Sequence, residues 1–345
     1  MLYVNGFSPA ILYGLAKVHK ANIPLRPILA AFKTASYRLA KFIIPAFDDL
    51  IQNGFTLKNT YDFKQFIDNY SFNQNVFLAS FDITSLFTNV PIKETIDIAT
   101  RWIYDQGGSY KNMSRNEFKR CLELCTLDNH FLFNGKHYVQ HEGFAMGNPV
   151  SATMANLFLA YHERNWLENC PVSFKPILYK RYVDDCFLAF KRRDHAELFL
   201  NYLNQQHRNI KFTMEEEENN KINFLDCTLT KSENGNTTSI IFNVFRKLTF
   251  TGLGMNFQSH TFFNFKINNI KTLLHRAFLI TSTWEGFTKE VDFLSKFFVN
   301  NGYPKNMVWN AVRKFLNKRF SSVSIATVAK MPLYHKIPFM NNYVL

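Results

Sequence analysis

The amino-acid sequence predicts an α+β fold from two observations. First, short apolar and β-branched runs in the middle of the chain are separated by turn residues, as in antiparallel hairpins. Second, the C-terminal part shows helical periodicity over 264–281, 286–300 and 304–319, with breaks near Gly302 and Pro304. With 345 residues the chain is long enough to bury a large core and to divide into two or three subdomains.

The composition excludes several classes of protein. A hydrophobic content of 47% excludes a disordered chain, and no run of about 18 apolar residues predicts a membrane helix. Residues 1–6 lack the layout of a signal peptide. Five scattered cysteines indicate a reducing compartment rather than a disulfide framework. Cys121 and Cys125, four apart on a predicted helix, leave a zinc pair open as an alternative, although no second pair has suitable spacing.

The net charge of +13 is divided unevenly along the chain. Residues 1–60 carry seven Lys and Arg against two Asp and Glu, and residues 246–345 carry fourteen against three. The segment between them is therefore mildly acidic. Basic flanks around an acidic centre favour a protein that binds phosphate backbones on either side of a metal-holding site. A generally basic soluble protein is the alternative.

The elements before the central hairpin follow from their patterns. The expected elements are a helix over 36–70, a strand over 76–82, helices over 91–105 and 115–128, a hairpin over 131–138 with an Asn-Gly turn, and a helix over 149–167. After the hairpin we expect a helix over 194–207, a strand over 210–214, a solvated acidic turn at 215–218, and strands over 222–230 and 238–245 around Asn234-Gly235.

Tyr182-Val183-Asp184-Asp185 lies between two apolar runs, 176–179 and 186–190, and therefore predicts a hairpin with two carboxylates at its tip. Two adjacent carboxylates repel each other, and a divalent cation is the usual counter-charge. A solvated acidic turn is the alternative. A third carboxylate, Asp82, ends the buried strand upstream, and three carboxylates so placed can hold two metal ions for an in-line phosphoryl displacement.

These blocks resemble, in order, the palm motifs of reverse transcriptases. The matching segments are Phe81–Phe87, Gly143–Pro149 and Tyr182–Asp185. Five further segments are similar to Penelope-like retroelement reverse transcriptases: Tyr13–Lys20, Ile23–Ile28, Phe224–Asp226, Phe250–Gly252 and Lys271–Ala277. The resemblance runs from about residue 13 to about residue 310. Tyr-x-Asp-Asp alone is a weak signal, whereas several ordered blocks at fitting intervals are a strong one.

The resemblance implies a right-hand polymerase with fingers, a palm built on a mixed or antiparallel sheet, and a helical thumb. The implied boundaries are fingers at 1–75, palm at 76–112, an insertion at 113–142, the second part of the palm at 143–250, and a thumb resembling a helix-turn-helix at 251–345. The implied activity is RNA-directed DNA polymerisation, and the implied partners are an RNA template, a DNA primer and deoxynucleoside triphosphates. Generic helix-turn-helix recognition of DNA is the competing interpretation of the C-terminal module.

The resemblance also assigns roles to residues. Asp82, Asp184 and Asp185 would be the catalytic carboxylates and the ligands of two Mg²⁺ ions, with Mn²⁺ as the alternative ion. The implied nucleotide-binding positions are Lys17, Lys20, Arg26, Ile83, Phe87, Met146 and Gly147. Phe87 would exclude the ribose 2′-hydroxyl by its bulk, because a phenyl ring offers no hydrogen bond there; a core phenylalanine is the alternative. Lys221 is the candidate general acid. The implied primer and duplex contacts are Arg246, Lys247, Lys271 and Arg276.

Three positions depart from the family pattern. Ala16 and Leu248 stand where proline is usual, and Asn148 stands where serine is usual. These departures keep a second hypothesis open, a catalytically decayed copy that only binds nucleic acid. An RNA-dependent RNA polymerase is a third hypothesis, which Phe87 disfavours. For the reverse transcriptase we expect an intracellular location, in the nucleus at the site of integration.

Overall fold

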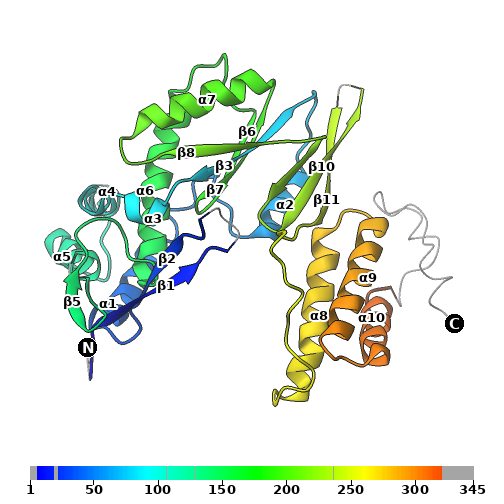
Figure 1. The fold of residues 1–345 in the computed structure, drawn as a ribbon. Helices are drawn as coiled ribbons and strands as arrows, with labels where there is room; N and C mark the ends of the chain where they lie inside the picture. Colours follow the sequence, from blue (N-terminus) through cyan, green and yellow to red (C-terminus); the bar gives the residue numbers. More distant parts are fainter. Residues whose placement is uncertain (1–5, 19–21, 106, 128, 236, 321–345) are drawn as a thin grey trace. The chain divides into compact units, whose positions relative to one another are not determined.

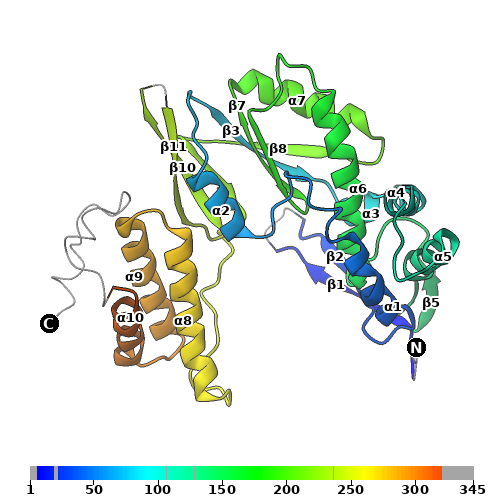
Figure 2. The same ribbon diagram turned by 180° about the vertical axis from the view of Figure 1, so that it is seen from behind.

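The structure, a computed structural model, describes residues 6–18, 22–105, 107–127, 129–235 and 237–320 (Figures 1 and 2). The chain contains helices and mostly antiparallel strands, with β1 and β4 as a parallel pair, which confirms the predicted α+β fold. The chain forms two compact units: residues 1–58 with 76–216, and residues 59–75 with 217–345. Within the described ranges, no helix combines the length and the apolarity needed to cross a lipid bilayer.

The first unit is built around a four-stranded antiparallel sheet with the order β6-β7-β3-β8. Its strands are β3 (Phe77–Ile83), β6 (Leu178–Tyr182), β7 (Asp185–Phe190) and β8 (Phe212–Glu216). Residues alternate between the two faces of a strand. In β3, Phe81 and Ile83 therefore face the core with the β7 residues Cys186 and Leu188, whereas Asp82 lies on the opposite face.

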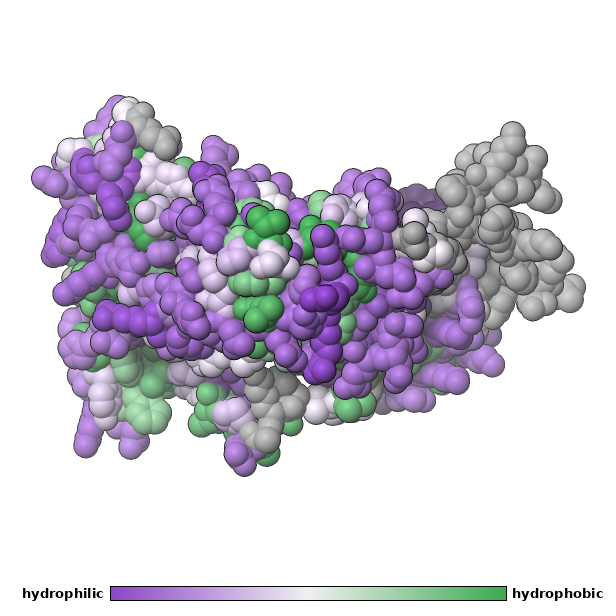
Figure 3. All heavy atoms as spheres, turned by 90° about the horizontal axis from the view of Figure 1, so that it is seen from above, coloured by the Kyte–Doolittle hydropathy of each residue, from purple (hydrophilic) through white to green (hydrophobic). Residues whose placement is uncertain are grey.

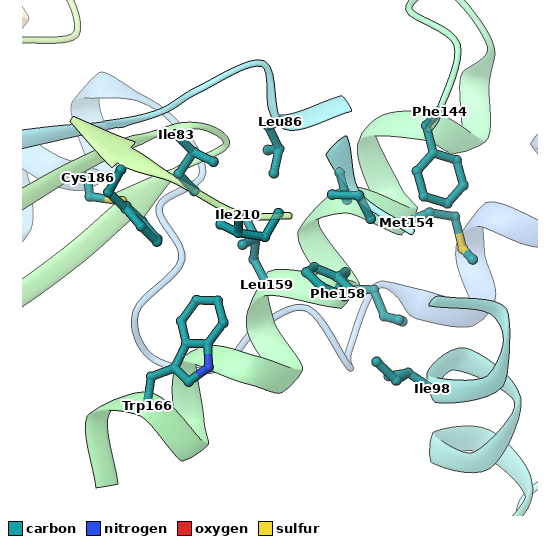
Figure 4. Packing of buried hydrophobic residues seen from close by; sticks show 14 of the residues in the cluster. Ile83, Leu86, Ile98, Phe144, Met154, Phe158, Leu159, Trp166, Cys186 and Ile210 are labelled. Atoms are coloured by element: carbon teal, nitrogen blue, oxygen red, sulfur yellow. The ribbon is translucent and has the colours of Figure 1, made fainter. Parts of the chain in front are cut away.

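Helices complete this core. They are α1 (Ser36–Ile43), α3 (Leu86–Asn89), α4 (Ile92–Tyr104), α5 (Arg115–Thr126), α6 (Pro149–Glu168) and α7 (Arg193–Gln206), with a 3₁₀ helix at Ile44–Phe47. Figure 4 shows side chains of α6, such as Met154, Phe158 and Trp166, packed beside residues from β3, α3, α4 and β7. The apolar positions of α6 lie all around the helix, so it is buried along most of its length.

A smaller sheet of the first unit has the order β2-β1-β4-β5. It contains β1 (Ala10–Ala16), β2 (Leu25–Ala30), β4 (His130–Phe133) and β5 (Lys136–Val139). The β4–β5 hairpin turns at Asn134-Gly135, as predicted, and both turn residues have positive φ.

The second unit combines a three-stranded sheet with helices. The sheet, ordered β11-β10-β9, consists of β9 (Lys221–Phe224), β10 (Cys227–Asn234) and β11 (Thr237–Val244). The helices are α2 (Thr60–Asp68), α8 (Phe263–Ile280), α9 (Trp284–Asn300) and α10 (Lys305–Phe320). The last three confirm the helical C-terminal module, and they share a core that includes Leu274, Phe287 and Phe298.

Three predicted elements differ in the structure. The helix expected over 36–70 is interrupted, because Pro45 ends the regular helix and Asn59 caps a new one, α2, which belongs to the other unit. The strand expected over 222–230 is two strands, β9 and β10, joined at Leu225-Asp226. The acidic segment is not a simple solvated turn.

In that acidic segment, Glu215 and Glu216 end β8, and Glu216 pairs with Arg193 at 2.7 Å. Glu217 pairs with the Lys231 ammonium at 2.5 Å, and both side chains are nearly buried. The run of four carboxylates therefore divides between two units, and part of it forms internal ion pairs that sequence alone could not show.

The boundary between the units also falls inside the segment 143–250 that was predicted as palm, because β9, β10 and β11 form one sheet that belongs to the second unit, where β11 packs with α2. A division by packing is not a division by function, so the fingers, palm and thumb boundaries stay a prediction. Figure 3 shows one face of the molecule, which is mainly hydrophilic and carries only small apolar areas.

Candidate active site

The end of β3 and the start of β7 bring the predicted carboxylates together. Asp82 and Asp185 are directly opposite each other in the antiparallel ladder, so their side chains leave the same face of the sheet. The backbone N–H of Ile83 donates to the carbonyl oxygen of Asp184 at 3.0 Å, which fixes the hairpin tip against β3. Asp82 and the Asp184-Asp185 pair, about a hundred residues apart in sequence, therefore lie together at one end of the two central strands, β3 and β7.

The hairpin turns in two residues, Val183 and Asp184. Val183 has φ +56°, a left-handed conformation that glycine adopts readily and a β-branched residue rarely does. Such a conformation persists only where the surroundings hold it, and it is concentrated at functional sites. The tip of the hairpin is therefore strained at Val183, the residue between Tyr182 and the two aspartates.

The residue types at this end of β3 and β7 fit a hard divalent cation. Carboxylate oxygens are the ligands that Mg²⁺ and Mn²⁺ prefer, and two carboxylates on one face of a ladder need a counter-charge. As the side chains stand, no group of three His, Cys, Asp or Glu residues within the described ranges converges closely enough to hold a metal ion. The ladder places Asp82 opposite Asp185, and the metal site itself stays a prediction.

The loop at 143–148 joins three parts of the first unit. A Cβ atom on Gly147 would lie 2.1 Å from the carbonyl oxygen of Leu29, and one on Gly143 would lie 2.4 Å from that of Thr88. Both glycines have positive φ. In the structure the missing side chains leave room for the backbones of β2 and α3, and the role of Gly147 in nucleotide binding stays a prediction.

Asn148, which stands where the family usually has serine, is buried and structural. Its Oδ1 accepts from the backbone N–H of Val150 and so caps α6, and its Nδ2 donates to the Cys125 carbonyl at 2.7 Å. The side chain therefore fixes the start of α6 and does not face solvent.

The predicted nucleotide-binding residues occupy different environments. Arg26 is exposed on β2, Lys17 is half-buried, and Lys20 lies outside the described residues. The side chain of Ile83 is buried in the core, so any contact with a nucleotide would come from its backbone. The remaining residues are Phe87, which is half-buried on α3 and packs against the core, half-buried Met146, and exposed Gly147.

The candidate general acid and duplex contacts all belong to the second unit. Lys221 is exposed at the start of β9, and Lys247 and Lys271 are exposed as well. Arg246 instead forms a two-pronged ion pair with Glu290 and stacks on the ring of Phe293, with its carbon Cζ 3.7 Å from the ring centre. Its guanidinium is thus already engaged within the protein.

Arg276 is engaged too, through an ion pair of 3.2 Å with Asp226 at the β9–β10 turn. The C-terminal helices of this unit were predicted to form a thumb that resembles a helix-turn-helix. There the exposed basic residues of α10 include Arg313 and Lys314, with no acidic residue in the helix.

Sequence reasoning missed two residues behind the hairpin, Arg181 and Glu163. They form an ion pair whose side chains are 0% and 1% exposed. Burial alone lowers the pKa of Arg181, but the charge and hydrogen bonds of Glu163 outweigh it and raise the pKa, so the guanidinium stays charged. The only signal in the sequence was an arginine next to Tyr182, within a strand that is otherwise largely apolar.

Solved structures with a similar fold are polymerases. Telomerase from Candida albicans in complex with a fragment of telomeric RNA aligns with 92% of this chain and 64% of its own, with 10% identity and a TM-score of 0.57. Apo telomerase from Candida tropicalis aligns with 91% and 59%, with 9% identity and a TM-score of 0.55. This chain has the right-hand polymerase fold.

Two further likenesses concern a viral enzyme and the C-terminal helices. The BmCPV RNA-dependent RNA polymerase at its elongation state aligns with 84% of this chain and 26% of its own, with 15% identity and a TM-score of 0.50. The chain thus spans less than two thirds of the length of these structures. The model of the animal helix-turn-helix domain matches residues 254–313, which confirms the predicted helix-turn-helix character there. No curated protein matches the chain in sequence.

Proposed function

We propose that this right-hand polymerase is an RNA-directed DNA polymerase of the Penelope-like type. The observation that carries the proposal is the juxtaposition of Asp82 with Asp185, with Asp184 at the strained tip beside them. The motif order along the sequence supports the Penelope-like assignment. We propose further that the enzyme acts in the nucleus on an RNA template and a DNA primer.

The three aspartates would hold two Mg²⁺ ions, or Mn²⁺ in their place. Bound divalent ions supply an activated primer 3′-hydroxyl and neutralise charge on the departing pyrophosphate. The residues of this chain supply positioning: the ladder between β3 and β7 fixes the backbones from which the carboxylates project. Exposed Arg26 would hold the triphosphate, and Phe87 would exclude a ribose 2′-hydroxyl. Lys221 would protonate the leaving group.

Primer extension on an RNA template tests this proposal. Asp184→Asn removes a metal-binding charge and keeps the shape, so we expect extension to fall at least about a hundredfold. The matched control is Asp226→Asn, which makes the same change in the other hairpin with an aspartate after a strained residue. We expect Asp226→Asn to retain extension within severalfold. Equal activity of wild type and Asp184→Asn would refute the proposal.

Two other candidates have observations in their favour. The departures Ala16, Asn148 and Leu248 favour a decayed copy, which predicts that the wild-type chain binds the template–primer duplex and does not extend it. The likeness to a viral RNA polymerase favours ribonucleotide use. Phe87→Ala distinguishes the sugar: if Phe87 is the gate, the variant incorporates ribonucleotides that the wild type rejects.

A further inference from the structure

A fully buried arginine stands directly behind the tip of the carboxylate hairpin. Arg181 belongs to β6, and it is the largest of the fully buried side chains. Its guanidinium donates five hydrogen bonds, all within the first unit. The acceptors are both carboxylate oxygens of Glu163 at 2.5 and 3.0 Å, Oδ1 of Asn156 at 2.7 Å, Oγ1 of Thr56 at 3.5 Å, and the carbonyl oxygen of Val183 at 3.0 Å.

The bond to Val183 distinguishes this arrangement from an ordinary buried ion pair. The other four bonds tie Arg181 to α6 and to the segment before α2, whereas this one reaches the backbone of the strained tip. A carbonyl oxygen held by a charged donor cannot rotate freely. The peptide between Val183 and Asp184 is therefore held in the orientation that the left-handed residue requires.

Glu163 is itself fixed on several sides. It accepts from the hydroxyl of Tyr179 at 2.7 Å and from Nδ2 of Asn53 at 3.2 Å, besides the two bonds from Arg181. Glu163 and Asn156 are seven residues apart on α6, so they lie on one face of the helix. The helix that begins at the glycine loop thus forms a rigid support for the guanidinium.

Stability alone does not account for a buried pair of this kind. Burying two charges costs much of what their attraction returns, and an apolar pair of similar volume is often as stable. A strained tip, in contrast, needs a specific support, because nothing in the local sequence favours positive φ at a valine. The hydrogen bond from Arg181 to the Val183 carbonyl connects the buried ion pair to the strained tip.

We propose that Arg181 is a positioning residue that holds the left-handed tip through the Val183 carbonyl and thereby fixes the directions of Asp184 and Asp185. The inference rests on the proposed polymerase function for its catalytic consequence. The structural part, restraint of the tip by a guanidinium fixed on α6, stands on the geometry of the first unit alone.

Arg181→Lys gives the first test. An ammonium on a flexible stem lacks the planar fork of arginine, so it cannot bond both Glu163 oxygens and the Val183 carbonyl together. We expect faster amide hydrogen exchange in a peptide spanning 178–190. In primer extension, we expect kcat to fall roughly tenfold to a hundredfold with KM for the deoxynucleotide unchanged, because the carboxylates are displaced while the triphosphate contacts remain.

Arg246→Lys is the matched control, because it changes another two-pronged arginine–glutamate pair, in the second unit, in the same way. It should leave exchange in 178–190 at the wild-type rate. A second variant is used in case Arg181→Lys does not fold. The double substitution Arg181→Met with Glu163→Leu removes both buried charges, so it should fold normally. It should nevertheless show the fast exchange and the reduced kcat.

The most decisive test is whether a glycine at position 183 restores the kcat lost in the Arg181 variants. Glycine adopts positive φ without support, so adding Val183→Gly to either Arg181 variant should restore most of the lost kcat. Wild-type exchange and kcat in the Arg181 variants, or lost kcat that glycine does not restore, would overturn the inference. The exchange measurement needs no catalysis, so an inactive wild-type chain would refute the proposed polymerase while the role of Arg181 is still decided.

Discussion

Two hairpins of this protein make the same unusual turn in different surroundings. Val183 has φ +56° and Leu225 has φ +53°, each is the first of two turn residues, and each is followed by an aspartate. Behind Val183 stands the buried guanidinium of Arg181. At the second turn, Arg276 instead pairs with the Asp226 carboxylate, whose side chain is 56% exposed.

The difference shows that a strained turn does not by itself define a site. In the second hairpin the strained residue sits between strands that are fixed by their own ladder, and the Asp226 carbonyl accepts from the Phe245 N–H at 2.8 Å. In the first, the Val183 carbonyl is held by Arg181 from the protein interior, and Asp185 lies opposite Asp82 in the ladder. Only the first arrangement presents paired carboxylates to a third.

Removing the charge behind the first hairpin should have the largest effect on stability. Glu163→Gln leaves the Arg181 guanidinium buried without a counter-charge. We expect the free energy of unfolding to fall by about 3–5 kcal/mol. Urea denaturation followed by tryptophan fluorescence measures the loss, since Trp102 and Trp166 lie in the first unit. A loss no larger than that of Asp226→Asn would contradict the contrast between the hairpins.

The pH dependence of the first unit should come from a histidine and not from the arginine behind the tip. Burial lowers the pKa of His162, although Glu94, which bonds its Nε2 at 3.0 Å, partly opposes this; His207 bonds the same carboxylate and lowers it further. Because the folded state favours the neutral ring, stability is complete above the unfolded pKa of about 6.5 and is lost as pH falls through the lower folded value.

We therefore expect the denaturation midpoint to decrease between pH 7 and pH 5, by less than the loss in Glu163→Gln. His162→Gln should flatten that part of the profile. An unchanged slope in the variant would assign the effect to another group.

The smallest effect should come from the exposed pair of the second hairpin. Asp226→Asn removes the attraction to Arg276, and an exposed pair contributes at most about 1 kcal/mol. Raising the salt concentration to about 1 M should bring wild type and variant together, because the charges are then screened within a few ångströms. A salt-independent difference would mean that the pair is more protected than its exposure indicates.

Much of the fold could be predicted from local patterns. The C-terminal helices, α4, α5 and α6 fall within a few residues of their predicted ranges, because caps, prolines and apolar periodicity act locally. The turn at Leu225-Asp226 could not be predicted, since the residue with positive φ is Leu225, and leucine does not favour that conformation. The break after α1 was missed for a different reason. Helix α2 packs in the second unit with a sheet that lies some 150 residues further along the chain, and local sequence does not show such a contact.

The sequence by itself determined the α+β class, the carboxylates and their order, because strand ends and turn residues mark where acidic side chains must emerge. Only the tertiary structure decided that Asp82 faces Asp185, that Asn148 and Ile83 are buried, and that Arg181 reaches the Val183 carbonyl. These depend on register and on contacts between residues far apart in the chain, where packing and the pairing of buried charges outweigh local preference.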